Sequence, residues 1–593
     1  MLLWMLACAP APAPAPYVVP AGATASLHDP DVDVAVWPDQ SHAAPDPTTA
    51  TGFTVPLRPG ARARLEQDLT PELLLLEALD ELDGFGTNGA AYFRFSGPVD
   101  LASAAAAVSG WRLSTGAPVP FDLSTTDEGA TLMIQPRGPL VPNERYAWVI
   151  TDALRAADGS QVWASPWTRA ALVAHAQPAQ DADMQAALRL AGVEAERVVD
   201  LTVFHTQSLH ARDLEGAEVL AAHTPTWTPG PCVVEGALER CELTLEVADL
   251  LGPDDRITPA EPLGIQQTYA LPVTVWLPVT RDAPLQVIVH GHGLSGDRYE
   301  ARGTAEQLAD LGFAVVAVDA PKHGDHPTTT TTADLLWVLE MFGISAVTGT
   351  FDPRVLRDQF RRAAWDKIQL VRALSAPTDL TGDGAPDVDG GFIAWTGHSL
   401  GGLLGPQLLA MSPELAGGVL SVPGGRMADI VRYGSVFAPL IVLMAPPGTS
   451  TGTIDRFFPL LQATIEAGDP ASWAPVLREQ GRDLFVTMVK DDDIIPNPTT
   501  AFLATALDVW LAGPEIIPIP GLTRYTDPLP ATGNHDGHTS ILWQYDVAHE
   551  GGVEVDATHG HIFDADEHIM QTRAFLDSLR RDGRGVVPDP GAR

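Results

Sequence analysis

The sequence predicts an α/β protein in which a doubly wound, mostly parallel sheet follows a smaller all-β domain. From about residue 268, apolar strand-like segments alternate with amphipathic helix-like segments, which is typical of a parallel sheet covered by helices on both faces. One of these strands runs directly into a glycine-rich turn at 397–401. Between 53 and 172, short alternating segments are separated by Gly, Pro and Asp, a spacing that favours a β-sandwich.

Residues 1–52 indicate an export signal followed by a tether. An apolar run ends at Leu6-Ala7-Cys8 and is followed by a tract of alternating Ala and Pro, which resembles a bacterial lipoprotein signal with a lipidated cysteine. The remainder, to about residue 50, lacks helical or strand periodicity, so we expect an extended spacer. This resemblance implies a cell-surface or periplasmic lipoprotein held to a membrane through Cys8, or otherwise a secreted protein.

The segment 53–172 is expected to form an accessory β-domain. Its late part, GPLVPNERYAWVITDALRAADGSQV, resembles bacterial immunoglobulin-like modules in its turn, strand and hairpin order. Residues 173–267 combine helical periodicity with a second β-rich patch, and we predict a connector there. Cys232 and Cys241 lie nine positions apart in that patch, a spacing that suits a loop closed by a disulfide.

Residues 268–582 are predicted to form the doubly wound domain, and 583–593 a tail. The clearest helix spans 353–375, because its apolar residues recur on one stripe. Residues 427–482 are long enough to include a helical cap over a site. The segments expected to be strands are LPVTVWLP, LQVIVHG, FAVVAVDA, FIAWTGHS, PLIVLMA and LFVTMVK.

Ser399 is the candidate nucleophile of this domain. It stands in Gly397-His398-Ser399-Leu400-Gly401, between a buried-type strand and a helix-compatible segment. Two glycines allow the tight, strained turn that holds a serine hydroxyl clear of the edge of a sheet. Together with the His-Gly loop and the acidic strand end upstream, in LQVIVHGHGLSG and FAVVAVDAPKHGDH, this arrangement resembles the α/β-hydrolase superfamily.

The resemblance implies an oxyanion hole made of backbone N–H groups. One donor is expected from the loop after the His-Gly pair, at His292 with Gly293 as the alternative, and the other from Leu400, the residue after the nucleophile. The side chains of His290 and His292 are then expected to shape the loop rather than to act as bases. No cofactor is expected for catalysis.

The resemblance also places an acid after a late strand and a base near the end of the domain. LFVTMVKDDDIIPNP supplies the acid as Asp492, which aligns through Ile495-Pro496 with the family form Asp-x-Ile-Val-Pro, and Asp491 and Asp493 flank it. His561 is the predicted base, because Gly560-His561 followed by apolar residues matches the usual Gly-His-Phe pattern. His559 and His568 are the alternatives.

An acidic loop precedes the strand that carries the nucleophile. In TDLTGDGAPDVDGG, oxygen-bearing side chains alternate around Gly384, as in loops that wrap carboxylates around Ca²⁺. Gly390 stands where the bidentate Glu of such loops is expected. A structural calcium site is one interpretation and a solvated acidic turn is the other. The candidate ligands are Asp379, Thr381, Asp383, Asp387 and Asp389.

The net charge of −39 excludes nucleic acid as a natural partner, because such a surface repels phosphate backbones. The whole pattern resembles bacterial extracellular lipases and esterases of the virulence-factor type with an N-terminal immunoglobulin-like domain. That resemblance implies hydrolysis of a small-molecule or lipid ester through a Ser-Asp-His triad and an acyl-enzyme. The alternatives are a peptidase or polyester depolymerase with the same triad, and a non-catalytic surface binding protein. The oligomeric state is not indicated.

Overall fold

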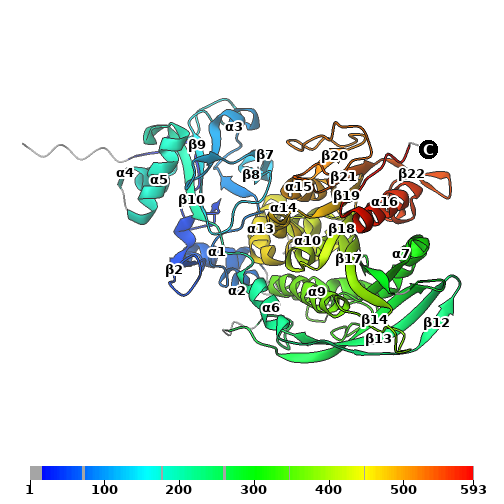
Figure 1. Cartoon of the computed structure of the whole chain (residues 1–593). Helices are drawn as coiled ribbons and strands as arrows, with labels where there is room; N and C mark the ends of the chain where they lie inside the picture. The colour runs from blue at the N-terminus through cyan, green and yellow to red at the C-terminus, as the bar shows by residue number, and fades with distance from the viewer. Residues whose placement is uncertain are drawn as a thin grey trace, which may run out of the picture.

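The computed structural model describes residues 17–69, 74–174, 178–257, 262–282, 284–345, 347–445 and 448–591. Figure 1 shows an N-terminal region, coloured blue to cyan, beside a larger body coloured green to red. In the described part of the chain, no helix has the length and apolar character needed to cross a membrane. Cys8 and the Ala-Pro tract up to residue 16 lie outside the described residues, so the lipid anchor stays a prediction.

Two four-stranded antiparallel sheets form the core of the N-terminal region, in the orders β1-β4-β8-β7 and β10-β9-β5-β6. Large buried side chains lie between them, among them Trp37, Phe93 and Trp148. The strands are β1 (Val36–Trp37), β4 (Ala91–Arg94), β5 (Val108–Arg112), β6 (Ala117–Pro118), β7 (Phe121–Thr126), β8 (Thr131–Pro136), β9 (Arg145–Thr151) and β10 (Val198–His205), with β2 (Ala44–Pro45) paired to β3 (Phe53–Thr54).

Short helices surround these sheets. They are η1 (Gln40–His42), α1 (Pro59–Asp68), α2 (Leu75–Leu79), α3 (Leu101–Ala107), η2 (Asp127–Gly129), α4 (Pro166–Ala174), α5 (Pro178–Ala191) and η3 (Ala195–Arg197).

The β-rich region is wider than the predicted 53–172. Strand β1 and the buried His28 come from the segment expected to be a spacer. At the other end, β10 comes from the expected connector and pairs with β9. Apolar residues at 34–37 and a buried ionic cluster around His28 hold the early segment against the sheets. The immunoglobulin-like assignment stays a prediction.

A single large sheet organises the rest of the chain, which confirms the predicted fold class. Its order is β11-β13-β14-β16-β15-β17-β18-β19-β21-β20, with β12 paired to β13. Neighbouring strands from β16 to β20 in this order are parallel, whereas β13, β14 and β16 pair antiparallel. The strands are β11 (Thr226–Thr228), β12 (Cys232–Glu235), β13 (Leu238–Asp249), β14 (Gln267–Pro278), β15 (Leu285–Gly291), β16 (Phe313–Val318), β17 (Val388–His398), β18 (Leu415–Ser421), β19 (Asp483–Val489), β20 (Trp510–Ala512) and β21 (Ser540–Tyr545).

Helices cover both faces of the large sheet. On one face, α9, α10, α14 and α15 contribute to the largest hydrophobic cluster; on the other, α7 and α16 bury apolar side chains against the sheet. The helices are α6 (Ala211–Ala221), η4 (Arg298–Glu300), α7 (Ala301–Leu308), η5 (Ala309–Leu311), α8 (Asp334–Met341), α9 (Pro353–Leu374), α10 (Leu400–Met411), α11 (Met427–Tyr433), α12 (Ala438–Met444), α13 (Thr451–Ile465), η6 (Glu466–Gly468), α14 (Pro470–Gln480), α15 (Asn497–Leu507), η7 (His561–Asp564) and α16 (Asp566–Asp582); a hairpin of β22 (Val547–Glu550) and β23 (Val553–Asp556) precedes η7.

One predicted strand is a helix. The segment PLIVLMA falls in α12, so the prediction of a strand there is wrong. A short apolar run suits a buried strand and a buried helix equally, and the helices α11 and α13 on either side decide between them. Figure 1 shows α13, in yellow, next to the N-terminal region, and α13 contacts α2 and β7.

Candidate active site

Ser399 lies in the tight turn between β17 and α10. Its backbone has φ 48° and ψ −105°, a strained conformation of the kind that persists where the surroundings enforce it. The turn needs its glycines, because a Cβ at Gly397 would lie 2.3 Å from the carbonyl oxygen of Gly401, and a Cβ at Gly401 would lie 2.1 Å from that of Gly291. The Ser399 N–H donates to the carbonyl of Ser421 on β18. The local sequence therefore fixes where the hydroxyl stands.

Asp492 follows β19 and is almost fully buried. Its Oδ1 accepts hydrogen bonds from the N–H groups of Ile494 and Ile495, at 3.0 and 2.9 Å. These two bonds orient the carboxylate. The structure thus brings the predicted Asp492 to the edge of the sheet where Ser399 lies.

The histidine between Asp492 and Ser399 is His559. Its Nδ1 lies 2.7 Å from Asp492 Oδ2, and its Nε2 lies 2.8 Å from Ser399 Oγ. The imidazole is about one-eighth exposed, whereas Ser399 and Asp492 are buried. Serine, histidine and carboxylate therefore form one hydrogen-bonded chain.

The structure contradicts the prediction of His561 as the base. His561 begins η7, is exposed, and its Nδ1 lies 3.4 Å from the backbone carbonyl of Asp556. His568 is buried on α16, where its Nε2 contacts Ser421 Oγ at 2.7 Å, and burial lowers its pKa to about 3. The Gly-His pattern selected His561 because it reads only neighbouring residues, whereas the position of each histidine depends on how the loop after β23 folds over Asp492.

The oxyanion loop is held by side-chain contacts of its own. His292 Nδ1 lies 2.8 Å from the carbonyl of Gly293, and its Nε2 accepts the N–H of Ala320 at 2.8 Å. Burial lowers the pKa of His292, so this imidazole is neutral and both ring nitrogens are engaged. These contacts tie the His292 side chain to the backbone of Gly293 and Ala320.

The backbone N–H of Gly293 already has a partner. It donates to both oxygens of Glu300, at 3.2 and 3.1 Å. Of the three predicted oxyanion donors, the structure therefore favours His292 and Leu400 over Gly293. Glu300, which sequence reasoning missed, stands within hydrogen-bonding reach of this loop because η4 follows it directly.

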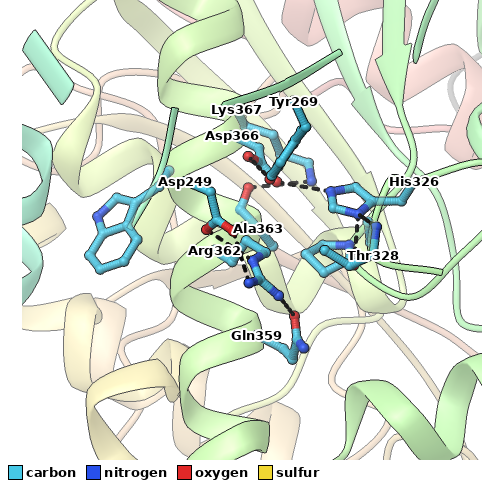
Figure 2. Close-up of polar contacts among 12 residues, drawn as sticks. Asp249, Tyr269, His326, Thr328, Gln359, Arg362, Ala363, Asp366 and Lys367 are labelled. Atoms are coloured by element: carbon cyan, nitrogen blue, oxygen red, sulfur yellow. Dashed lines mark hydrogen bonds and ion pairs between the residues drawn. The ribbon is translucent and has the colours of Figure 1, made fainter. Parts of the chain in front are cut away.

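A buried polar network lies between α9, β13 and β14 (Figure 2). Asp366 on α9 accepts from Tyr269 OH at 2.6 Å and lies 3.1 Å from Nε2 of His326. Arg362, one turn earlier on the same helix, pairs with Asp249 at 3.0 Å. The network joins α9 to the loop after β16, whose Ala320 holds His292. Contacts therefore run from α9 through the loop after β16 to His292.

The acidic loop before β17 uses its carboxylates on its own backbone. Asp387 accepts from the N–H groups of Leu380 and Thr381, and Asp379 accepts from those of Gly382 and Gly384. The carboxylates of Asp383 and Asp389 also accept from N–H groups of the loop. Among the described residues, no three side chains of this loop meet the geometry of a metal-binding cluster. The structure gives the calcium prediction no support.

Cys232 and Cys241 are joined by a disulfide. They are directly opposite each other in the pair formed by β12 and β13. The disulfide therefore closes a hairpin at the antiparallel end of the large sheet.

The part of the chain that holds Ser399, Asp492 and His559 is similar to known proteins. A sequence model of the alpha/beta hydrolase family matches residues 286–584. No curated protein matches the chain.

Several solved structures are similar at low identity. Acetyl xylan esterase 1 from Thermoanaerobacterium sp. JW/SL YS485 is 17% identical, with 50% of this chain and 81% of that chain covered and a TM-score of 0.34. A glucuronoyl esterase from Teredinibacter turnerae is 16% identical over 55% and 74% of the two chains, with a TM-score of 0.30. The acylaminoacyl peptidase of Pyrococcus horikoshii is 13% identical over 62% and 51%, with a TM-score of 0.32. Likenesses of this strength carry no argument about substrate.

Proposed function

Because the chain belongs to the alpha/beta hydrolase family, we propose that it is a serine hydrolase that cleaves carboxylic esters. The observation that carries this proposal is the hydrogen-bonded chain from Asp492 through His559 to the hydroxyl of Ser399. A serine hydroxyl is a weak nucleophile until a neighbouring base takes its proton, and a carboxylate behind that base holds the ring and stabilises its cation.

The proposed reaction proceeds by acyl transfer. His559 Nε2 takes the proton of Ser399 Oγ as the oxygen attacks the ester carbonyl, and the negative charge on the carbonyl oxygen is stabilised by the N–H groups of Leu400 and His292. The protonated His559 then gives its proton to the leaving alcohol. Water, deprotonated by the same imidazole, attacks the acyl-enzyme and releases the acid. Asp492 holds the imidazole in place and stabilises its positive charge.

An apolar cavity supports an ester with a hydrophobic arm. The cavity has a volume of about 90 Å³ and opens between α12, α13 and the segment around Ile344. Most of its lining side chains pack in one hydrophobic cluster with Leu400, and Leu294 and Ile494, next to the oxyanion loop and the acid, pack against that cluster. Leu400, next to the nucleophile, and most of the cavity lining therefore belong to one hydrophobic cluster. The lining includes Phe351, Phe437, Ile441, Ile454, Phe457 and Leu461.

The test is turnover of p-nitrophenyl acetate, butyrate and octanoate by the wild type and Ser399→Ala. We expect the variant to lose about 10⁴-fold or more in kcat, which is typical when a triad serine is removed. Equal, background-level rates for both proteins would overturn the proposal.

The cavity has its own test within the same series. Ile454→Trp places a larger side chain in the cavity wall and should lower octanoate turnover relative to acetate. Val553→Trp, on the exposed β22–β23 hairpin, is the matched control and should leave this ratio unchanged. An unchanged ratio in both variants would remove the cavity from the substrate path.

A further inference from the structure

Three segments of the proposed active site meet at the carboxylate of Glu300. Its Oε1 lies 2.7 Å from Nδ1 of His398, the residue before the nucleophile. Both oxygens accept the N–H of Gly293 in the oxyanion loop. The same Oε1 faces Nε2 of His290, at the end of β15, at 3.8 Å. We propose that Glu300 is a positioning residue that fixes the oxyanion loop against the nucleophile turn, an inference that rests on the proposed function.

The hydrogen bond with His398 is well defined. Burial is the largest influence on the pKa of His398 and lowers it to about 4, so the ring is neutral and its Nδ1–H donates to the carboxylate. The ring of Phe563 stacks on His398 with the ring centroids 3.3 Å apart. Glu300 and Phe563 together hold His398 in one orientation, and the backbone of His398 leads directly into Ser399.

Glu300 is an anion at the pH where a serine hydrolase works. Burial acts to raise its pKa, but the facing imidazoles of His290 and His398 outweigh burial and hold the pKa well below its ordinary value. An ionised carboxylate accepts stronger hydrogen bonds than a neutral amide or acid. This strength suits a group that must keep Gly293 turned away from the substrate.

The contact with Gly293 sets the geometry of the oxyanion hole. With its N–H pointing at Glu300, Gly293 cannot donate to the substrate, and the neighbouring peptide group of His292 is fixed with it. A second bond, from Gly401 N–H to the carbonyl of His292 at 3.0 Å, ties the same loop to α10. Without Glu300 the loop keeps this bond and the contact between His292 and Ala320, but nothing fixes the Gly293 N–H, so the peptide group between His292 and Gly293 can turn relative to Ser399. Oxyanion donors act only when they are held in place before the charge develops.

Two substitutions of Glu300 distinguish its hydrogen bonds to the loop from its negative charge. Glu300→Ala removes every contact, and Glu300→Gln keeps an oxygen that accepts from Gly293 and an amide that can pair with the other tautomer of His398. We expect Glu300→Ala to lower kcat by about 10²-fold, as when one oxyanion donor is lost, with KM changed less than about threefold. Glu300→Gln should recover most of the activity. The matched control is Glu306→Ala on α7, the helix that follows Glu300, where Glu306 pairs with Arg302 on the surface.

A second measurement does not depend on the ester. The rate at which a fluorophosphonate labels Ser399 reports on the nucleophile and on the oxyanion donors, and it should fall in Glu300→Ala in parallel with kcat. Ser399→Ala should not be labelled. If the wild type labels but does not hydrolyse esters, the proposed function fails, while slower labelling of Glu300→Ala still supports the positioning role.

Three results would overturn the inference. The first is labelling and kcat in Glu300→Ala equal to those of the wild type, and the second is an equal loss of both in Glu306→Ala. The third is one equivalent of a divalent metal in the purified protein that disappears in His290→Ala, because His290, Glu300 and His398 bring their ligand atoms within 4.8 Å of one another. An ion there would replace the hydrogen bond on which the positioning role depends. Thermal unfolding of each variant shows whether a loss of activity reflects loss of the fold.

Discussion

Two clusters in this molecule contain the same residue types and differ in the order of their contacts. In the hydrolase half, His559 stands between Ser399 and Asp492. In the N-terminal region, His28 stands between two carboxylates, with Asp200 at Nδ1 at 2.7 Å and Asp39 at Nε2. Ser26 donates to Asp200 rather than to a histidine. Serine, histidine and aspartate are thus present twice, but only one arrangement leaves a ring nitrogen free to take a proton from serine.

The second cluster is built for stability. His28 must donate from both ring nitrogens, so it is a cation. Burial acts to lower its pKa, but the charges of Asp200 and Asp39 outweigh burial and raise it to about 10. A base that is already protonated at neutral pH cannot activate a nucleophile. All members of the cluster are also buried.

The largest expected effect is the loss of kcat on substitution of His559. His559→Ala should lower kcat by about 10⁴-fold or more, because Ser399 loses its base. His561→Ala, two residues away on an exposed turn, should keep activity within about threefold. Steady-state kinetics with p-nitrophenyl butyrate decides between them. If His561→Ala loses activity and His559→Ala keeps it, His561 is the base. The contrast between the His559 cluster and the His28 cluster would then fail.

A smaller effect, on stability alone, is expected from His28→Ala. Removing the cation leaves Asp39 and Asp200 buried without a partner, which costs about 3–5 kcal/mol when a buried ion pair is broken. Urea unfolding measures this loss. Well below the unfolding temperature, ester turnover should stay within about twofold of the wild type. His205→Ala, which removes an exposed contact with Asn143, is the control and should change stability little. A loss of turnover in folded His28→Ala would show that the two clusters are not separate in function.

The pH dependence of stability tests whether His28 is a buried cation, unlike His559. The pKa of His28 is raised above its ordinary 6.5 to about 10. Its contribution is therefore fully present below pH 6.5 and is lost as the pH rises through about 10, because the unfolded chain releases the proton first. The wild type should lose up to about 1.4 kcal/mol per pH unit in this window from this group. The slope should be smaller in His28→Gln, and equal slopes would exclude His28 as the source.

The smallest effect is expected where the two regions meet. Glu466, after α13, accepts from Thr87 N–H at 2.6 Å, Asn88 N–H at 2.7 Å and Gln207 Nε2 at 3.0 Å. Burial outweighs these bonds and raises the pKa of Glu466 to about 7. The folded state then holds this proton more tightly than the unfolded chain, so stability should fall as the pH rises from about 4.5 to 7.

Glu466→Gln tests this contact. The variant should be less stable throughout, because an amide N–H₂ faces donors. Its melting temperature should also depend less on pH than that of the wild type between pH 5 and 8. A steeper dependence in the variant would contradict the assigned sign.

The sequence alone could locate the candidate nucleophile and the candidate acid, because local chemistry specifies both positions. Ser399 requires glycines at 397 and 401, and Asp492 is fixed by the N–H groups of the two residues that precede Pro496. The alternation of strands and helices likewise follows from local periodicity, so the fold class could be predicted. Each of these features depends on residues close together in the chain.

The features that sequence reasoning missed depend on contacts between distant segments. His559 and His561 have similar neighbours, and only the packing of their loop over Asp492 separates them. The spacer around His28 is polar by composition, but Asp200, about 170 residues later, supplies the charge that lets it be buried. Glu300 carries no motif, since its partners Gly293 and His398 come from two different turns.

The end of α1 has a practical consequence for anyone who would work with the hydrolase half in isolation. Asp68 and Leu69, from the N-terminal region, line the cavity together with side chains of α12 and α13. A fragment that begins just after β10 would keep Ser399, Asp492 and His559. It would lose Asp68 and Leu69, which form part of the cavity wall against which a hydrophobic arm would rest. Such a fragment should show altered selectivity and a greater tendency to aggregate, so the intact chain is the unit for screening substrates.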